Sequence, residues 1–281
     1  MLRIVTDGAA DVPLEWQKEF DIQVLPVNIQ FGDKTYLQWV DLSQEDFYRM
    51  VDENHKIPKT SQPTPHQFTA FYQKVAQPGD TILSIHPSGK LSGTLNSAIT
   101  AGRDLAGQFE VIPFDSFSGS TAIGFLCREA RLLEQAGKPM VEILAQLERM
   151  RSKISVFLTL DTLEYARLSG RVGALQSTLG SLLNLKPIAT VADGVISIIE
   201  KARTRRVSIQ RIVDLAQEKA GNQLVNVTIV HARDPQTGAT LVERVRETLN
   251  IHEIVLTDLS LSIASNLGPG TVGIIFCPVE Y

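Results

Sequence analysis

The first half of the chain alternates strand-like and helix-like segments, and this alternation limits the possible folds most. Strand patterns occupy residues 2–6, 22–31, 81–86 and 109–114, and the stretches between them are long enough for helices. Such alternation is typical of βαβ units, whose strands run parallel in one sheet with helices packed on its faces. We therefore expect a parallel α/β domain.

Two of the intervening stretches carry signals for the start of a helix. Ser43 precedes Asp46 by three residues, as in a capping box, and Thr64 precedes Pro65, which is favoured in a first helical turn. Apolar residues at helical spacing begin at residue 95. We therefore expect Ser92 to lie close to a helix N-terminus.

The pattern changes near residue 150. Helical patterns at 120–135 and 139–151 close the first half, whereas the second half has strand patterns on both sides of Asp193-Gly194, a dipeptide that favours an antiparallel hairpin. Further strand patterns lie at 154–159, 224–231, 254–257 and 271–277, with a helical pattern at 235–249. We expect two domains, residues 1–150 with a parallel sheet and residues 151–281 with a mainly antiparallel sheet.

Charge and apolar runs exclude several classes of partner. Lys and Arg number 27 and Asp and Glu number 31, which gives a formal net charge of −4. Because nucleic-acid binding needs a clustered basic excess, we expect no nucleic-acid partner.

No apolar run approaches ~18 residues and no secretory signal pattern is present, so we expect a cytoplasmic protein without stable membrane insertion. Cys127 and Cys277 are expected as buried, reduced thiols.

The enzyme and cofactor motifs considered next are incomplete or wrongly placed in this sequence. Residues 268–273 fit the letters of a dinucleotide fingerprint but lead into a strand pattern rather than a helix. Gly89-Lys90 lacks the Ser or Thr and the earlier Gly of a phosphate-binding loop. The five histidines show no spacing suited to zinc. We therefore expect no cofactor and no metal.

One catalytic arrangement stays open as an alternative. Ser92, His86 and Asp115 all fall at the ends of expected strands or helices, so a serine hydrolase acting on an acyl ester or phosphoester through Ser92 is a second hypothesis. The G-x-S-x-G elbow of many such enzymes is missing from the sequence. The three residues are equally suited to turns and helix caps.

Small hydroxyl residues and glycines concentrate in two loops, residues 59–65 and 86–94. Both are expected at the edge where open α/β sheets bind ligands. Hydroxyl groups and free backbone N–H groups at helix N-termini suit a carboxylate or a phosphate. Thr60, Ser61 and Ser92 could instead only cap helices. The residues alone indicate an anion-binding α/β protein.

Several short motifs follow one another in a specific order and spacing. They are TDGAADVP (6–13), TSQP (60–63), SGKLSGT (88–94), DS (115–116), SGRV (169–172), LNLKPI (183–188), DG (193–194) and GPG (268–270). In this order they resemble the DegV family of fatty-acid-binding proteins, and the resemblance extends over nearly the whole chain.

The resemblance implies a two-domain α/β fold. An N-terminal α/β/α domain with a parallel sheet would be joined to a C-terminal α/β domain with a mainly antiparallel sheet, and a long-chain fatty acid such as a palmitate-like acid would lie in a buried tunnel between them. The protein would not be an enzyme. It would present the acid to the catalytic subunit of a fatty acid kinase, which forms acyl phosphate for phospholipid synthesis.

The resemblance also implies ligand-binding residues. Thr60 and Ser92 would hydrogen-bond the carboxylate, with Ser61 and the Gly93 backbone adjoining and Arg171 nearby as a positive group. Burial of about fifteen methylene-like groups at ~0.8 kcal/mol each would let the tail dominate the affinity. Candidate lining residues are Leu182, Ile188, Ile196, Ile263 and Ile274, each of which is also suited to an ordinary core position.

The sequence departs from the usual family pattern at two places. Gly8 stands where the first motif usually has Ser, and Asn266-Leu267 stands where the glycine-rich motif usually begins with His-Thr. Asn266 can still donate and accept hydrogen bonds, but it cannot become cationic.

The densest basic run of the chain is Lys201, Arg203, Arg205 and Arg206. Such a run is usually a solvated surface, and it could also dock an acidic kinase subunit through electrostatic steering.

Overall fold

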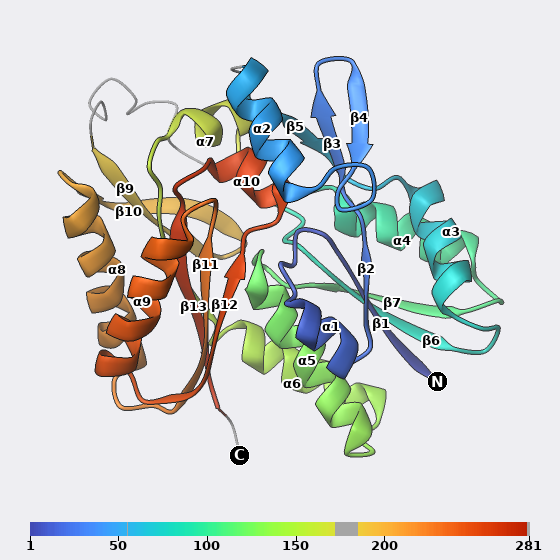
Figure 1. Cartoon of the computed structure of the whole chain (residues 1–281). Helices are drawn as coiled ribbons and strands as arrows, with labels where there is room; N and C mark the ends of the chain where they lie inside the picture. Colours follow the sequence, from blue (N-terminus) through green and yellow to red (C-terminus); the bar gives the residue numbers. More distant parts are fainter. Residues whose placement is uncertain (55, 172–184, 280–281) are drawn as a thin grey trace. The chain divides into compact units, whose positions relative to one another are not determined.

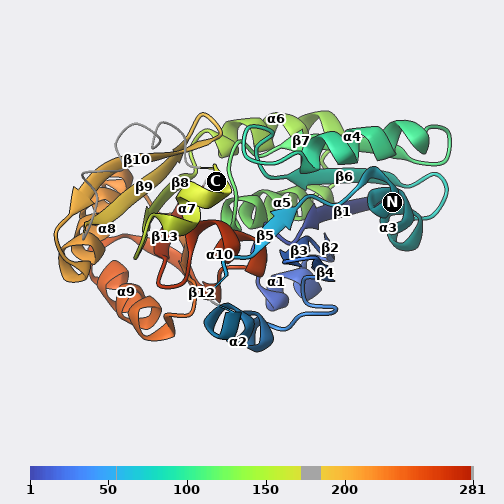
Figure 2. The same cartoon turned by 90° about the horizontal axis from the view of Figure 1, so that it is seen from above.

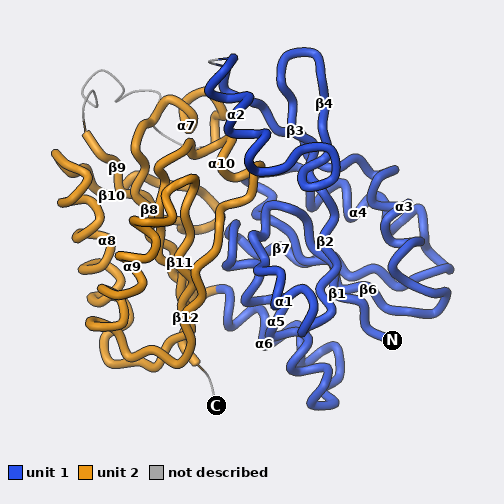
Figure 3. The backbone as a smooth tube through the Cα atoms, in the orientation of Figure 1, with its two compact units in different colours: residues 1–151 blue, residues 152–281 orange. Residues whose placement is uncertain are grey.

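The computed structural model describes residues 1–54, 56–171 and 185–279, which form two compact units (Figure 1). Unit 1 is Met1–Arg151 and unit 2 is Ser152–Tyr281 (Figure 3). The motif residues Val172, Leu183 and Asn184 and the candidate lining residue Leu182 lie outside the described residues.

A four-stranded parallel sheet forms the centre of unit 1. Its strands are, in spatial order, β2 (Ile22–Leu25), β1 (Leu2–Asp7), β6 (Thr81–His86) and β7 (Glu110–Asp115). All three neighbouring pairs run parallel, which confirms the fold class expected for this half. The apolar runs alternate across the sheet, so Val5 and Ile82 face one side while Ile4 and Leu83 face the other. All four side chains are fully buried, so both faces of the sheet are covered.

Helices supply that cover. The helices of unit 1 are α1 (Leu14–Glu19), α2 (Gln44–Asn54), α3 (Pro65–Val75), α4 (Thr94–Asp104), α5 (Thr121–Gln135) and α6 (Met140–Arg151). Helices α1, α3, α4 and α5 pack against this sheet, and α6 packs on α5. Phe68 and Tyr72 of α3 and Ala98 of α4 share one core with Val5 and Ile82 of the sheet. Helix α5 packs against β1 and β6.

The expected strand at 22–31 is wrong, because the chain forms two strands there in different sheets. β2 joins the parallel sheet, whereas β3 (Asn28–Phe31) pairs antiparallel with β4 (Lys34–Leu37) and β5 (Lys59–Ser61) in a three-stranded sheet. Pro26 lies between β2 and β3 and has no N–H to donate to a ladder, which suits it to the break. The expected loop at 59–65 therefore begins as an edge strand.

The predicted helix starts are confirmed. The Ser43 hydroxyl accepts a hydrogen bond from the Asp46 backbone N–H at 3.1 Å. Thr64 forms a full capping box with Gln67, and Pro65 takes the first helical position. Helix α4 begins at Thr94, so Ser92 lies just before its N-terminus, as expected.

Unit 2 contains a six-stranded mixed sheet. Its order is β10 (Val195–Ala202), β9 (Lys186–Ala192), β8 (Ser155–Thr159), β13 (Val272–Pro278), β11 (Val225–His231) and β12 (Ile251–Asp258). Among these pairs β11 and β12 run parallel and the others antiparallel, so the mainly antiparallel sheet is confirmed. Asp193 and Gly194 both have positive φ, at 50° and 77°, as a tight hairpin turn requires.

The helices described in unit 2 are α7 (Glu164–Ser169), α8 (Arg205–Ala220), α9 (Pro235–Thr248) and α10 (Leu261–Leu267). Helices α8 and α9 lie side by side against the sheet (Figure 1, Figure 2). Ile212 and Val213 of α8 and Leu241 of α9 share a core with Val227 and Ile274 of the strands. Helix α8 begins at Arg205, within the basic run of residues 201–206. The sequence analysis identified this run only by its charge and did not predict the helix.

Both cysteines are free and fully buried, as expected. Burial raises the pKa of the Cys127 thiol, which therefore stays protonated at neutral pH. Within the described residues, no group of three or more His, Cys, Asp or Glu side chains could hold a metal ion. None of the helices in the described part of the chain is both long and apolar enough to cross a bilayer.

Candidate functional site

The two hydroxyl-rich loops of unit 1 lie against each other. A Cβ atom added to Gly93 would lie only 2.5 Å from Gln62 Nε2, so the Gln62 side chain packs directly on the Gly93 backbone. Gln62 follows Ser61 immediately, and Gly93 follows Ser92. The contact therefore brings the segment of Thr60 and Ser61 next to the start of α4.

Strand β5 and its neighbours position the first of these segments. Thr60 pairs with Ile29 and Ser61 with Asn28 of β3. The Asn28 amide donates to the Gln62 carbonyl at 3.3 Å and exchanges hydrogen bonds of 3.2 and 3.1 Å with the Gln67 side chain of α3. Thr60 is half-buried and Ser61 is exposed. The segment is thus fixed at both ends while its hydroxyls stay accessible.

The N-terminus of α4 positions the second segment. The Ser92 hydroxyl lies 2.7 Å from the Thr94 hydroxyl and accepts from the Thr94 backbone N–H at 3.3 Å. Ser92 and Gly93 are both half-buried. The first N–H groups of a helix have no partner within it, and the helix dipole makes this end partially positive. A carboxylate at this place would meet a hydroxyl, backbone N–H groups and a favourable dipole.

A chain of buried hydrogen bonds includes His86, the residue at which the second loop begins. The Tyr72 hydroxyl lies 2.7 Å from Ser84 Oγ, which lies 2.6 Å from His86 Nε2, and His86 Nδ1 lies 2.7 Å from Asp7 Oδ2. All four side chains are fully buried. Because a carboxylate only accepts, His86 Nδ1 donates to Asp7, and His86 Nε2 lies within hydrogen-bond distance of the Ser84 hydroxyl. Burial also raises the pKa of Tyr72, so its hydroxyl stays protonated and can donate.

The hydrogen bonds do not join Ser92, His86 and Asp115 into a catalytic arrangement. Both ring nitrogens of His86 are taken by Ser84 and Asp7, and the Ser92 hydroxyl bonds to Thr94 instead. His86 lies at the buried end of β6, in agreement with the expected strand at 81–86. Activation of Ser92 would need a hydrogen bond between Ser92 and His86, and in this structure His86 bonds to Ser84 and Asp7 instead.

Asp115 has a supporting role for the 88–92 loop. Its carboxylate accepts from the backbone N–H groups of Gly89 at 3.2 Å and Phe117 at 2.8 Å. Arg151 donates to the Asp115 carbonyl at 2.8 Å, and its guanidinium lies 4.2 Å from the centre of the Phe117 ring. These contacts hold the turn before Ser92 in place.

The departure at Gly8 has a structural counterpart that sequence reasoning missed. Gln38 is fully buried, and its amide donates to the Gly8 carbonyl at 2.9 Å. A Cβ atom at Gly8 would lie 2.3 Å from Gln38 Nε2. Gln38 thus occupies the space that a serine side chain would need. The two residues are thirty positions apart, so no local pattern could reveal their contact.

The two predicted site residues of unit 2 lie near the ends of α7 and α10. The Arg171 guanidinium donates to the Ser169 carbonyl at 2.5 Å, and the Ser169 hydroxyl donates to the Asn266 carbonyl at 3.5 Å. The Asn266 side-chain amide donates to the Ser262 carbonyl at 2.6 Å within its own helix. Ser169 therefore connects the two predicted residues, both of which are half-buried.

Glycine allows these two helix ends to approach. Gly268 ends α10 with φ of +87°, a conformation that favours glycine, and a Cβ atom there would lie 2.8 Å from the Tyr165 ring of α7. The structure thus places Thr60, Ser61, Ser92 and Gly93 together in unit 1, and Arg171 with Asn266 in unit 2.

The basic run does not form one patch. Arg205 turns inward, where it donates to Asp234 at 3.1 Å and to the Gly270 carbonyl. Lys201, Arg203 and Arg206 are exposed. Arg205 therefore pairs within unit 2, whereas the docking of an acidic kinase subunit by this run stays a prediction.

Comparison with known proteins gives a consistent result. The model of the DegV family, described as "Uncharacterised protein, DegV family", matches residues 1–279. Protein DegV of Bacillus subtilis (strain 168) is 31% identical to this chain over 278 residues, which cover 98% of this chain and 99% of the relative.

Solved structures agree with the fold. A DegV family protein from Thermus thermophilus, described by its fatty acid binding, is 30% identical with a TM-score of 0.91, and the match covers 99% of each chain. DegV from Bacillus subtilis, described as a fatty acid binding protein, is 29% identical with a TM-score of 0.86, again over 99% of each chain. These matches confirm the predicted two-domain α/β fold.

Proposed function

The chain belongs to the DegV family, and from this premise we propose that it binds a long-chain fatty acid. Two relatives of 29–30% identity are described as fatty acid binding. The observation that carries the proposal is the contact between Gln62 and Gly93, which brings the two hydroxyl-rich segments of unit 1 together.

Thr60 and Ser92 take the carboxylate in this proposal. A buried carboxylate without partners is costly, and hydrogen bonds to a charged oxygen are stronger than neutral ones. The two hydroxyls donate to it, Ser61 and the Gly93 backbone adjoin them, and the first turn of α4 supplies N–H groups and a positive dipole end. Arg171 and Asn266 of unit 2 complete the site, Arg171 with a positive charge and Asn266 with a neutral amide.

The tail lies in a buried tunnel between the units. Its burial yields roughly 12 kcal/mol before ordering costs, so the tail determines the affinity and the hydroxyls determine the orientation. Ile188 and Ile274 already belong to the core of unit 2 and Ile196 is buried, whereas Ile263 on α10 is half-buried. Ile263 is therefore the best candidate among the described residues for contact with the tail.

The protein acts as a carrier rather than as an enzyme. In this proposal it works in the cytoplasm and presents the bound carboxylate to the catalytic subunit of a fatty acid kinase, which forms acyl phosphate for phospholipid synthesis. The bond between Ser92 and Thr94, together with the full occupancy of the His86 ring, supports a binding role over hydrolysis through Ser92.

Mass spectrometry of an organic extract tests the proposal. The purified protein should carry a near-stoichiometric amount of long-chain fatty acid, and the double variant Thr60→Ala/Ser92→Ala should retain at least about tenfold less. Thr100→Ala/Thr240→Ala removes two helix threonines outside the site and serves as the control. Circular dichroism should be the same for all three proteins.

Two results would overturn the proposal. One is an unchanged lipid content in the Thr60→Ala/Ser92→Ala variant. The other is turnover of a chromogenic ester that is lost in Ser92→Ala, which would establish the hydrolase instead. Acyl phosphate formed by a fatty acid kinase subunit with ATP, measured with the loaded protein and with free acid, tests the presenting role.

A further inference from the structure

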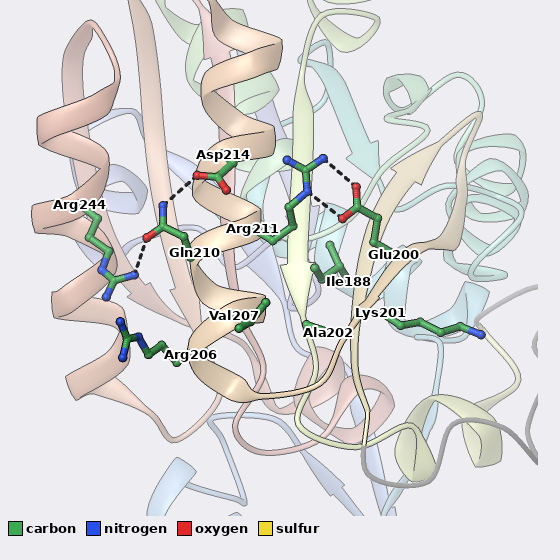
Figure 4. A pocket seen from close by; sticks show the side chains of 10 residues that line it. All are labelled: Ile188, Glu200, Lys201, Ala202, Arg206, Val207, Gln210, Arg211, Asp214 and Arg244. Carbon is green, nitrogen blue, oxygen red and sulfur yellow. Dashed lines mark hydrogen bonds and ion pairs between the residues drawn. The ribbon is translucent and has the colours of Figure 1, made fainter.

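Unit 2 carries a surface pocket to which the fatty-acid proposal assigns no carboxylate-binding residue, although the candidate tail-lining residue Ile188 forms part of its wall. Its volume is about 460 Å³, and it lies between strands β9 and β10 and helices α8 and α9 (Figure 4). None of the six predicted fatty-acid-binding residues lines it. The buried side chains of Ile188 and Ala202 form an apolar part of its wall.

The pocket has an excess of positive charge. Lys201, Arg206, Arg211 and Arg244 line it together with two carboxylates, Glu200 and Asp214. Glu200 is already bound by Arg211 through two hydrogen bonds of 2.8 Å.

Three cations of the pocket have no acidic partner in the part of the chain that the structure describes. Asp214 accepts from the Gln210 amide at 2.8 Å. Among the described residues, no carboxylate lies within ion-pair distance of Lys201, Arg206 or Arg244. These three side chains are therefore available to a bound anion.

Two of these cations are arranged on one side of the pocket. Arg206 and Gln210 are four residues apart on α8, so they share a face of the helix. The Gln210 side-chain oxygen accepts from Arg244 of α9 at 3.1 Å, and this bond directs the Arg244 guanidinium toward α8. In Figure 4 Arg206 and Arg244 lie on one side of α8, and Arg211 with Glu200 lies on the other.

We propose that this pocket binds a small phosphorylated molecule, with its phosphate group held by Arg206 and Arg244. Guanidinium groups present several N–H donors in a plane and match phosphate oxygens in pairs. A phosphate carries up to two negative charges at neutral pH, which balances two arginines, whereas a single carboxylate leaves one unmatched. The volume is within the range of small-molecule sites, and the apolar wall suits the organic part.

Isothermal titration calorimetry with inorganic pyrophosphate and with AMP tests this site. The protein should bind both probes saturably, and the Arg206→Ala/Arg244→Ala variant should bind them at least about tenfold more weakly. Arg203→Ala/Arg246→Ala removes the same charge from two exposed arginines outside the pocket and should change the affinity by less than about twofold. The fatty acid content should stay the same in both variants, which separates this proposal from the previous one.

Several outcomes would overturn the inference. They are the absence of saturable binding up to ~10 mM of either probe, equal weakening in both double variants, and tighter binding of a tetra-aspartate peptide than of pyrophosphate. Tighter binding to phosphatidylglycerol vesicles than to AMP would likewise show that the arginines serve a membrane surface.

Discussion

Two clusters of polar side chains, one in each unit, are held in different ways. In unit 1, Asp7, Ser84 and His86 form one fully buried chain of hydrogen bonds. In unit 2, Arg211 bridges Glu200 and Glu218, and the three side chains are 30%, 37% and 62% exposed. Buried hydrogen bonds fix a geometry because their loss leaves a polar group without water, whereas exposed pairs are easily replaced by water.

This difference bears on the two proposed sites. In unit 1 the Ser92 hydroxyl bonds to the buried Thr94 and the Thr60 segment pairs with β3, so the backbone that carries both hydroxyls is set before a ligand arrives. The arginines of the unit 2 pocket lie at the surface and can reorient around a ligand. Substitutions should therefore cost much more stability in the first case than in the second.

The largest effect is expected for His86→Ala. The substitution removes the His86 partner from the buried Asp7 carboxylate, which keeps the hydrogen bond from the Ala9 backbone N–H, and should lower the free energy of unfolding by about 3 kcal/mol. The two tryptophans of the chain, Trp16 and Trp39, both lie in unit 1, so urea unfolding followed by tryptophan fluorescence reports this unit. His252→Ala, at an exposed histidine of unit 2, should change that transition by less than about 0.5 kcal/mol. A loss below about 1 kcal/mol for His86→Ala would show that the buried chain is not essential to unit 1.

An intermediate effect is expected for Gly8→Ser. The added side chain would displace the buried Gln38, and such overpacking should lower the free energy of unfolding by about 2 kcal/mol in the same fluorescence measurement. In a Gln38→Ala background, the cost of Gly8→Ser should be much smaller, because the space is then free. Equal costs in both backgrounds would contradict the steric explanation.

The smallest effect is expected for Arg211→Ala. Because the Arg211 and Glu200 side chains are about a third exposed or more, water and salt screen their ion pair. The substitution should therefore lower the free energy of unfolding by about 0.5–1 kcal/mol. Hydrogen exchange of peptides from β10 and α8, followed by mass spectrometry, measures it within unit 2. A decrease in the free energy of unfolding as large as that for His86→Ala would contradict the expected difference between the buried cluster of unit 1 and the exposed pair of unit 2.

The same pair predicts a pH dependence. Hydrogen bonds from Arg211 hold the pKa of the Glu200 carboxyl below its usual range. A carboxyl whose pKa is lower in the folded protein than in the unfolded chain stabilises the folded protein at pH values above its pKa in the unfolded chain, which is about 4.3. This stabilisation is lost as the pH falls through the pKa that the carboxyl has in the folded protein. The difference in free energy of unfolding between the unchanged protein and the Arg211→Ala variant should therefore be constant from neutral pH to about 5 and become smaller at lower pH. A difference that grows on acidification would contradict this sign.

The sequence predicted those parts of the fold that have a local signal. Strands β1, β6 and β7 are apolar runs, and Asp193-Gly194 specifies its hairpin. The three-stranded sheet was missed because β4 has a mixed polarity and β5 depends on pairing with β3, about thirty residues away. Helix α8 had a usable signal, since Ile209, Ile212, Val213 and Ala216 follow helical spacing after the cap at Thr204.

The candidate site shows the same limit. The hydroxyl residues could be found by composition, and the start of α4 by its periodicity. The contacts that organise them could not, because Gln62 meets Gly93 and Gln38 meets Gly8 only after the chain has folded. His86 was assigned to a possible catalytic group because its contact with Asp7 joins residues 79 positions apart, although Ser84, two residues before it on the expected strand, shares its face of the sheet.

The placement of the two cysteines gives each unit its own chemical reporter. Cys127 lies in unit 1 and Cys277 in unit 2, and neither side chain has any accessible surface. An alkylating reagent can reach either sulfur only while the surrounding structure is open. The rates at which the two cysteine-containing peptides gain mass would thus count the opening events of the two halves of the native protein separately, without any engineered label.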